Sequence, residues 1–279
     1  MSRLTNKSPQ CRRTAHLACL ALLLAGSVAA AAEYRFTPEP TYTPEAAEEI
    51  YRPLLDYLSK ATGETFILVA PANYSSYWRE IRQPDNTDFS YDEAHFADYR
   101  IQRANFIPLV RRLQPTSYTL QASPYFEGNT ESPKGLENAK IATMPAPSLG
   151  YALLAEIFPD PVQQPEIKSN SASWRDAMDI LNSGEADAMI FPTWMLETFG
   201  NPSNITVFTS SEFAGPAVLA SPSVPEDVRN KVRDALLNVE GAPELAELLL
   251  ELGVTRFVPA SAEDYKGNQS MLSGFYGYK

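Results

Sequence analysis

Cysteine and histidine, the side chains behind most redox, metal and nucleophilic chemistry, are scarce in this sequence. It contains two of each, and Cys11, His16 and Cys19 all precede residue 20. A chain that loses this N-terminal segment keeps no thiol and has His95 as its one histidine. Disulfides and cysteine-ligated metals are then excluded, and a catalytic triad has only one possible base. We therefore expect no cofactor and no bound metal ion.

Long apolar runs are missing too. The run from Leu17 to Ala25 is far shorter than the roughly 20 residues that span a bilayer, and no later stretch approaches that length. A basic segment precedes this run, and the small residues from Val28 to Ala32 follow it. That order is typical of a secretory signal peptide. We predict that residues 1–32 form a signal peptide and that the mature protein is periplasmic.

Positive charge is in short supply. The whole chain has 23 basic and 34 acidic residues, and the predicted signal peptide contains four of the basic ones. Without those four, the mature chain keeps 19 basic against 34 acidic residues, a net charge of −15. Nucleic acid and anionic membrane surfaces are poor partners for such a chain, so we expect it to bind no nucleic acid.

What the sequence does have is an alternation of short apolar runs with amphipathic helical periods, the pattern of an α/β fold. Thr43 and Pro44 predict the start of a helix that Gly63 ends. Further helices are expected after Asn73 and at 173–181, 225–237 and 243–252. Strands are expected at 34–37, 66–69, 87–91, 106–110, 118–122 and 187–191. The tail after Tyr265 is rich in glycine and tyrosine, and we expect it to be loosely held.

One junction in mid-chain points to a ligand. Residues 139–151 predict a short buried strand, a proline-rich loop and a helix that starts near Ser148. The first N–H groups of such a helix are unpaired and its dipole is positive there, so this end suits a bound ligand. In open α/β sheets ligands collect at the carboxyl ends of strands. The junction indicates capture of a small solute, and an ordinary strand–helix turn that binds nothing is the alternative.

The order of several segments resembles one known family. The segments are RPLLDYLSKATG at 52–63, APANY at 70–74, the loop at 145–151, LNSGEADAMI at 181–190, VPEDVRNKVRDALL at 224–237 and GVTRFVPASAEDY at 253–265. In this order they resemble the type II periplasmic solute-binding proteins, and among these the phosphate/phosphite/phosphonate-binding family of ABC importers. The likeness covers nearly the whole mature chain.

This resemblance implies an α/β fold of two lobes, the type II periplasmic binding protein fold, with two crossing strands near 118–123 and 212–219. Lobe 1 would comprise 33–120 plus 217–279, and lobe 2 would comprise 121–216. A small-molecule ligand would be held between lobes that close on it, without turnover. The implied partner is an inner-membrane permease or a membrane sensor, and we expect the protein to be a monomer.

The ligand contacts of the family carry over only in part. Its members hold the phosphonate with a Pro-x-Ser-Thr-Ser-Gly cluster, whereas this chain has Pro-Ala-Pro-Ser-Leu-Gly at 145–150 and keeps only the hydroxyl of Ser148. A Gly-Pro-x-x-Tyr loop of lobe 1 is replaced by Tyr-Asp-Glu-Ala-His at 91–95. The aromatic residue of the first loop survives as Tyr42. Membership of the fold is therefore better supported than phosphonate specificity.

The positions that differ from the family's ligand contacts all change the chemistry of the site in the same direction. Trp174 and Pro192 stand where polar contacts are usual in the family, and Thr193 and Trp194 come next. Fewer hydroxyls and more indoles and carboxylates favour a larger, flatter or less negative ligand, because anions are recognised by hydroxyl, N–H and Arg donors. Aromatic faces beside carboxylates suit ammonium groups. The residues expected to converge on one gap between the lobes are Tyr42, Asp92, Glu93, His95, Ser148, Trp174, Thr193 and Trp194.

Other interpretations stay open. Trp174 and Trp194 also suit plain packing between lobes. His95, in an extended or turn segment with Asp92 and Glu93, invites a metal site or the acid and base of a hydrolase, although the chain has no Gly-x-Ser-x-Gly motif. A sensor that passes ligand occupancy to a membrane receptor would need the same gap as a transport protein.

One basic neighbourhood offsets the acidic remainder of the chain. Its members are Arg79, Arg82, Arg100, Arg103, Arg111 and Arg112. A member that turns into the gap would neutralise an oxyanion and restore the specificity of the family. The alternative is that they all form a solvated face of lobe 1.

Overall fold

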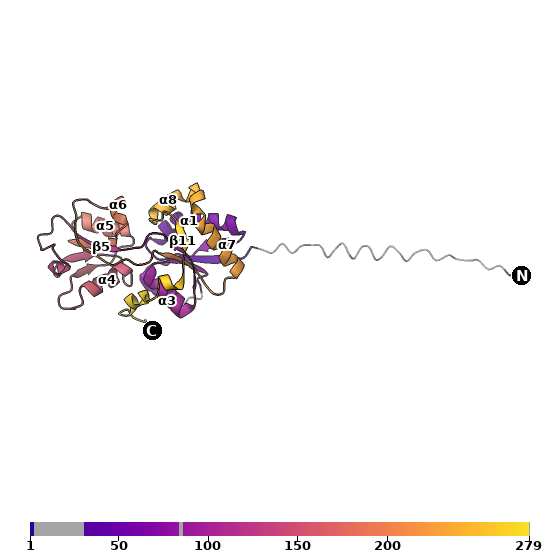
Figure 1. Cartoon of the computed structure of the whole chain (residues 1–279), viewed down its shortest axis with the longest axis horizontal. Coiled ribbons are helices and arrows are strands. Elements are labelled where there is room, and N and C mark those ends of the chain that lie inside the picture. Colours follow the sequence, from indigo (N-terminus) through magenta and orange to yellow (C-terminus); the bar gives the residue numbers. More distant parts are fainter. Residues whose placement is uncertain (3–30, 84–85, 279) are drawn as a thin grey trace. The chain divides into compact units, whose positions relative to one another are not determined.

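The computed structural model describes residues 1–2, 31–83 and 86–278 of the chain (Figure 1). The predicted signal peptide, residues 1–32, lies almost entirely outside these ranges, and so do Cys11, His16 and Cys19. The rest of the chain, Glu33–Lys279, forms one unit by itself. Among the described helices, none is both long and apolar enough to cross a membrane.

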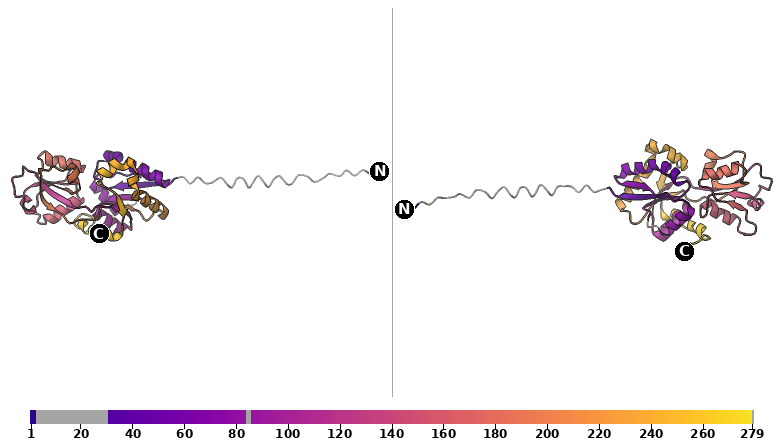
Figure 2. Two further views of the ribbon diagram at one scale, coloured as in Figure 1. Left: turned by 45° about the horizontal axis from the view of Figure 1, so that its top comes forward. Right: turned by 180° about the vertical axis from the view of Figure 1, so that it is seen from behind.

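The first sheet has six strands in the order β11-β4-β10-β3-β1-β2. Their bounds are β1 Glu33–Pro38, β2 Thr65–Leu68, β3 Phe89–Asp92, β4 Ile107–Arg112, β10 Ala217–Ala220 and β11 Phe257–Pro259. β1 pairs in parallel with β2 and β3, whereas β10 is antiparallel to β3 and β4. Strands from both ends of this unit therefore share one sheet, as the purple and orange ribbons around it show (Figure 2).

The second sheet has five strands in the order β7-β6-β8-β5-β9, all from the middle of the chain. Their bounds are β5 Tyr118–Ala122, β6 Lys140–Ala142, β7 Glu166–Lys168, β8 Ala188–Pro192 and β9 Ile205–Thr209. β6 is parallel to β7 and β8, and β5 is antiparallel to β8 and β9. Two mixed sheets with helices packed on them are the architecture that the alternating pattern predicts.

The helices fall into two groups. With the first sheet go α1 Pro44–Thr62, α2 Tyr74–Arg82, α3 Ala94–Ala104, α7 Glu226–Leu237 and α8 Ala246–Glu251. With the second go α4 Leu149–Ile157, α5 Trp174–Asn182 and α6 Met195–Phe199. Short 3₁₀ helices are η1 Pro133–Leu136, η2 Val239–Gly241, η3 Pro243–Leu245, η4 Ala262–Asp264 and η5 Asn268–Leu272.

Helix α1 begins and ends as its sequence predicts. The Thr43 side chain accepts a hydrogen bond from the backbone N–H of Ala46 at 3.3 Å. At the other end Gly63 has φ 80°, a left-handed conformation that glycine adopts without the strain of a side chain, and its N–H bonds to the carbonyl of Ser59. The buried face of α1 packs on the first sheet, which fixes the loop between β1 and α1.

Two segments differ from expectation. Residues 92–95 do not form an extended or turn segment, because β3 ends at Asp92 and α3 begins two residues later at Ala94. The tail after Tyr265 is not loosely held. Tyr265 and Leu272 have no exposed surface, and η5 packs on both α3 and α4. Tyrosine and phenylalanine side chains of the tail supply the apolar area that holds it.

The chain passes between the two sheets twice, from β4 to β5 and from β9 to β10. These connections are paired: the N–H of Thr116 bonds to the carbonyl of Phe213 at 2.9 Å, and the N–H of Phe213 returns a bond at 2.8 Å. The two connections therefore lie side by side. The lobe limits of 33–120 plus 217–279 and 121–216 stay a prediction; β5 pairs along its whole length within the second sheet.

Candidate functional site

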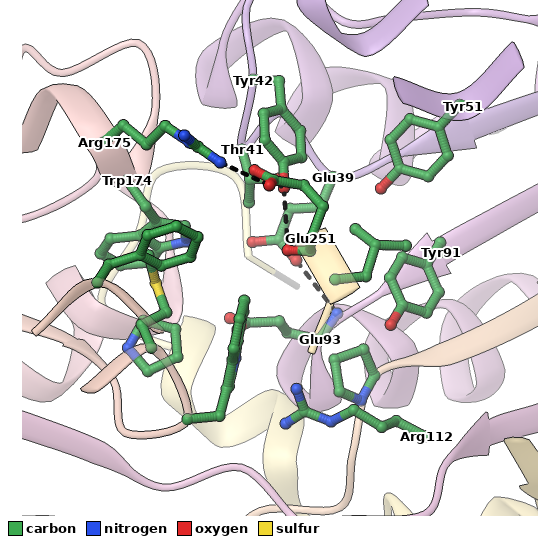
Figure 3. Close-up of a pocket in the computed structure, with 16 residues that line it drawn as sticks. Glu39, Thr41, Tyr42, Tyr51, Tyr91, Glu93, Arg112, Trp174, Arg175 and Glu251 are labelled. Atoms are coloured by element: carbon green, nitrogen blue, oxygen red, sulfur yellow. Dashed lines mark hydrogen bonds and ion pairs between the residues drawn. The ribbon is translucent and has the colours of Figure 1, made fainter. Parts of the chain in front are cut away.

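A cavity of about 70 Å³ is lined by elements of both sheets (Figure 3). The first sheet contributes the loop after β1, the ends of β3 and β4, and the end of α8. The second contributes the start of α5 and the segment from the end of β8 through α6. The cavity thus lies at the carboxyl ends of β1, β3, β4 and β8, where α/β sheets commonly bind ligands.

The buried Glu39 and the half-buried Glu93 form one wall. The hydroxyl of Tyr74 donates to Glu39 Oε1 at 2.7 Å, and the backbone N–H of Glu93 donates to Glu39 Oε2 at 3.1 Å. The hydroxyl of Tyr118 lies 2.6 and 2.7 Å from the two carboxylate oxygens of Glu93. These contacts hold the two carboxylates next to each other, each against a phenol that donates to it.

Burial raises the pKa of both carboxyl groups. The pKa of Glu39 is well above its ordinary value because the group is removed from water and because Glu93 lies nearby. Burial raises the pKa of Glu93 to about 7, against the opposing effects of the Tyr118 hydrogen bond and the charge of Arg112. Near neutral pH the pair of carboxyl groups can therefore either bind a proton or release one.

The guanidinium of Arg112 and the phenol of Tyr91 form another part of the lining. Arg112 is 1% exposed; its Nε donates to the carbonyl of Gln114 at 3.2 Å and its Nη2 to Thr116 Oγ1 at 2.5 Å. The guanidinium carbon lies 5.7 Å from the centre of the Trp194 ring. Tyr91 presents a buried hydroxyl that has no hydrogen-bond partner among the described residues. An unpaired buried hydroxyl in a cavity wall is a free contact for a ligand.

An ion pair closes the upper side of the cavity. Arg175 Nη2, at the start of α5, lies 2.6 Å from Glu251 Oε2 at the end of α8, so the pair links elements of the two sheets. The hydroxyl of Tyr42 donates to Glu251 Oε1 at 3.3 Å. Figure 3 shows Trp174 and Arg175 on one side, with the rings of Tyr51 and Tyr91 opposite. Carboxylates stand between these two sides.

Four of the sequence-predicted residues lie in this lining: Tyr42, Glu93, Trp174 and Trp194. Thr193 lies next to it, but its hydroxyl already bonds to Ser117 at 2.9 Å and to Thr119 at 2.7 Å. Trp174 is 8% exposed and also packs on the ring of Tyr118, so it serves packing as well as lining.

Asp92 and His95 do not converge on the gap as expected. Side chains alternate along β3, so Tyr91 lines the cavity and Asp92 points away from it. Asp92 accepts hydrogen bonds from Ser90, from the Tyr77 hydroxyl and from Arg100 Nε at 3.1 Å. His95 lies in the first turn of α3 with no exposed surface, and burial lowers its pKa to about 3.

Ser148 also lies outside the cavity. It caps α4: its Oγ accepts from the N–H of Tyr151 at 3.3 Å and donates to the carbonyl of Met144 at 3.0 Å. The helix start is tightly packed, because a Cβ added at Gly150 would lie 3.3 Å from Tyr118 and 3.4 Å from Trp174. The proposed anion end of this helix is thus covered by aromatic side chains rather than open to a ligand.

Sequence reasoning missed several lining residues. Glu39 sits between two prolines directly after the first strand, and that position was a usable signal. Arg112 belongs to the basic neighbourhood and does turn into the cavity, and Arg175 follows Trp174 directly. Glu251 gave no signal, because only the tertiary fold brings α8 to α5. Within the described ranges, no group of three or more His, Cys, Asp or Glu side chains could hold a metal ion.

Comparison with known proteins extends these observations. Residues 36–265 match the family model of ABC-transporter phosphonate periplasmic substrate-binding proteins. A search of curated protein sequences found no match. Among solved structures, PhnD1 from Prochlorococcus marinus in complex with methylphosphonate is 16% identical with a TM-score of 0.72, covering 86% of this chain and 97% of its own.

Two further structures show the same fold. A binding protein component of an ABC phosphonate transporter from Pseudomonas aeruginosa is 14% identical with a TM-score of 0.67, covering 84% of this chain and 83% of its own. A Xanthomonas citri protein solved with ATP bound is 14% identical with a TM-score of 0.66, covering 88% and 97%. The two-sheet arrangement is that of the type II periplasmic binding proteins.

Proposed function

Because the chain belongs to the phosphonate-type periplasmic substrate-binding proteins of ABC transporters, we propose that it captures a small polar ligand in the cavity between its two sheets and presents it to an inner-membrane importer. The observation that carries this proposal is the cavity itself. It has charged and aromatic walls from both sheets and is closed by the Arg175–Glu251 ion pair. Such a site suits a protein whose halves open to admit a ligand and close on it.

We propose further that the ligand specificity has diverged from phosphonates. A phosphonate needs several donors aimed at its oxygens. Here the hydroxyl of Ser148 is used inside the loop, and the start of α4 is covered by Tyr118 and Trp174. The cavity wall instead carries three carboxylates, those of Glu39, Glu93 and Glu251. In their ionised forms Glu39 and Glu93 repel an oxyanion, whereas Glu251 is paired with Arg175 and Arg112 opposes the repulsion at one end.

The expectations on export, lobe limits and oligomeric state are part of the same proposal. The family is periplasmic, which supports export through residues 1–32. The two lobes with the limits given above and a monomer that docks on a permease are further parts of the proposal. A sensor role would use the same cavity. A hydrolase is disfavoured, because His95 has no exposed surface and its lowered pKa makes it a poor base at neutral pH.

Protein purified from the periplasm provides the test. Native mass spectrometry would show a retained ligand by its mass, and thermal unfolding would be followed with phosphate, methylphosphonate, amines, amino acids and divalent cations. A ligand at about 100 times its Kd adds about 2.7 kcal/mol, which raises Tm by about 5–10 °C for a domain of this size. No retained mass and no shift with any of these compounds would refute a role in small-solute capture.

A further inference from the structure

Two carboxylates of the cavity, those of Glu39 and Glu93, are not in ion-pair contact with a basic side chain of the described residues. Arg100 neutralises Asp92, with Nε 3.1 Å from Oδ2. In the described part of the chain no ion pair joins Glu39 or Glu93 to a basic side chain, and their partners are phenol hydroxyls and a backbone N–H. A carboxylate taken out of water without a cation is costly. The charge of Arg112 acts on Glu93 without an ion-pair contact, so the pair favours bound protons or the further positive charge of a ligand.

We propose that the cavity recognises a protonated primary amine, bound between the carboxylates of Glu39 and Glu93; this rests on the proposed function as a solute-binding protein. The ammonium donates N–H bonds to carboxylate oxygens, which still have lone pairs beyond those that Tyr74 and Tyr118 occupy. Binding replaces the proton that the pair otherwise holds, so capture of the amine releases a proton.

The remaining walls fit a small organic cation. Tyr42, Trp174 and Tyr91 surround the carboxylates with aromatic surface, which attracts cations. The volume of about 70 Å³ exceeds the about 10–15 Å³ that a cavity needs to hold one water, so it admits a small solute. The unpaired Tyr91 hydroxyl and Arg112 can meet a hydroxyl on the second carbon. Ethanolamine has this size and these groups.

The approach to the cavity is acidic. A second hollow of about 550 Å³ shares Tyr42, Arg175 and Glu251 with the cavity, so it lies just outside the ion pair. Its other acidic residues are Glu49, Asp176, Glu244 and Glu247. Charge of one sign around an access path raises the local concentration of ligands of the opposite sign. A cation therefore has an electrostatic route to the site, and a phosphonate does not.

The other charged and titratable groups around the glutamate pair keep their charge near neutral pH. Burial raises the pKa of Tyr91 to about 12 and raises the pKa values of Tyr74 and Tyr118 well above the ordinary value, so these phenols stay neutral. Arg112 stays protonated although burial lowers its pKa. Asp92 is paired with Arg100. Glu39 and Glu93 are thus the groups whose charge changes there.

Calorimetric titration of the full-length protein with ethanolamine tests the proposal. We expect binding at pH 8, with Kd about tenfold higher at pH 6, where the pair holds more proton and the amine must displace it. The measured heat should change with the ionisation enthalpy of the buffer, as proton release requires. Ethylammonium should bind too, and methylphosphonate and Mg²⁺ should not.

Isosteric variants locate the site. Glu93→Gln and Glu39→Gln should each weaken ethanolamine binding about 10- to 100-fold, because each removes a charged hydrogen-bond acceptor. Glu156→Gln is the matched control: Glu156 is exposed on α4 and should bind as the unaltered protein does. If Glu93→Gln fails to fold, as judged by circular dichroism, the Glu39→Gln variant and the pH dependence of the unaltered protein decide.

The outcomes separate this inference from the proposed function. Binding of methylphosphonate or Mg²⁺ without any binding of amines overturns the amine inference and leaves solute capture intact. Amine binding that is equal at pH 6 and pH 8 and equal in both glutamine variants overturns it as well. Absence of any bound solute, in titrations and in native mass spectrometry, overturns the proposed function together with it.

Discussion

Asp92 and Glu93 are neighbours in sequence, and the structure gives them opposite roles. Asp92 is fully buried with Arg100, also fully buried, at 3.1 Å. Removal of the sole partner from a buried charge costs about 3–5 kcal/mol, but Arg100 would keep a second partner, Glu80, at 2.7 Å. Asp92→Asn should therefore lower Tm by less than the about 6–20 °C that the full cost gives at about 2–4 °C per kcal/mol. Ligand affinity of the folded protein should change little, because Asp92 does not line the cavity.

Glu93→Gln should have the opposite effects: ligand affinity should fall, whereas stability should not. The amide oxygen of the substituted side chain would still accept the Tyr118 hydrogen bond, but the cavity would lose a desolvated charge. Because burial raises the pKa of Glu93 to about 7, its contribution to stability is present below the unfolded pKa, near 4.3, and is lost as pH rises through about 7. The variant should be as stable as the unaltered protein at pH 4 and more stable at pH 8.

Circular dichroism melts of the two variants at pH 4, 6 and 8, beside calorimetric titrations, measure both effects. If Asp92→Asn keeps Tm within about 2 °C and no longer binds the ligand, Asp92 is a binding residue. The conclusion that Asp92 points away from the cavity while Glu93 lines it would then be wrong. If Glu93→Gln is markedly destabilised at pH 8, the carboxylate is stabilising in its ionised form and the account of its burial fails.

Three other substitutions have measurable outcomes. Trp174→Ala should weaken ligand binding and also lower the free energy of unfolding by about 3–5 kcal/mol. Trp194→Ala, at a half-buried position, should mainly weaken binding. Equal Tm values for the two variants would contradict their different burial. Arg175→Ala should leave Tm within about 4 °C, because exposed ion pairs contribute about 0–1 kcal/mol, but it should speed ligand release in stopped-flow measurements. An unchanged release rate would mean that the pair with Glu251 does not gate the cavity. Leu272→Ala should cost about 2–5 kcal/mol in urea unfolding, since this side chain has no exposed surface, and a loss below about 0.5 kcal/mol would show that the tail is loosely held after all.

The sequence was informative where local rules act. The Thr43 cap, the glycine end of α1 and the apolar runs placed helices and strands, because capping and periodicity depend on residues a few positions apart. The order of the segments that resemble the family predicted the two-sheet arrangement. Helix α3 was missed, because Ala94 follows β3 without a side-chain cap or a turn residue to mark its start.

The site was less predictable, because it is made of long-range contacts. Tyr42 and Glu251 are far apart in sequence and meet through one hydrogen bond. Whether a side chain at the end of β3 faces the cavity depends on the register of β3 against β1 and β10, which no local pattern fixes. The sequence therefore named Asp92 beside Glu93 but could not say that only the second faces the ligand cavity.

The C-terminal segment makes contacts of two kinds. The N–H of Gln269 bonds to Asp98, and the indole N–H of Trp78 bonds to the carbonyl of Tyr276, so polar bonds tie the segment to α2 and α3. Its contact with α4 is apolar and includes the ring pair Tyr151–Phe275, with centroids 6.0 Å apart. Hydrogen bonds require a narrow range of distances and angles and so resist separation, whereas two aromatic rings can separate and pack again in several relative orientations. Under the proposed opening and closing of the protein on a solute, the fluorescence of a tryptophan introduced by Phe275→Trp should change with each cycle. It would then report the arrival of a solute that carries no label.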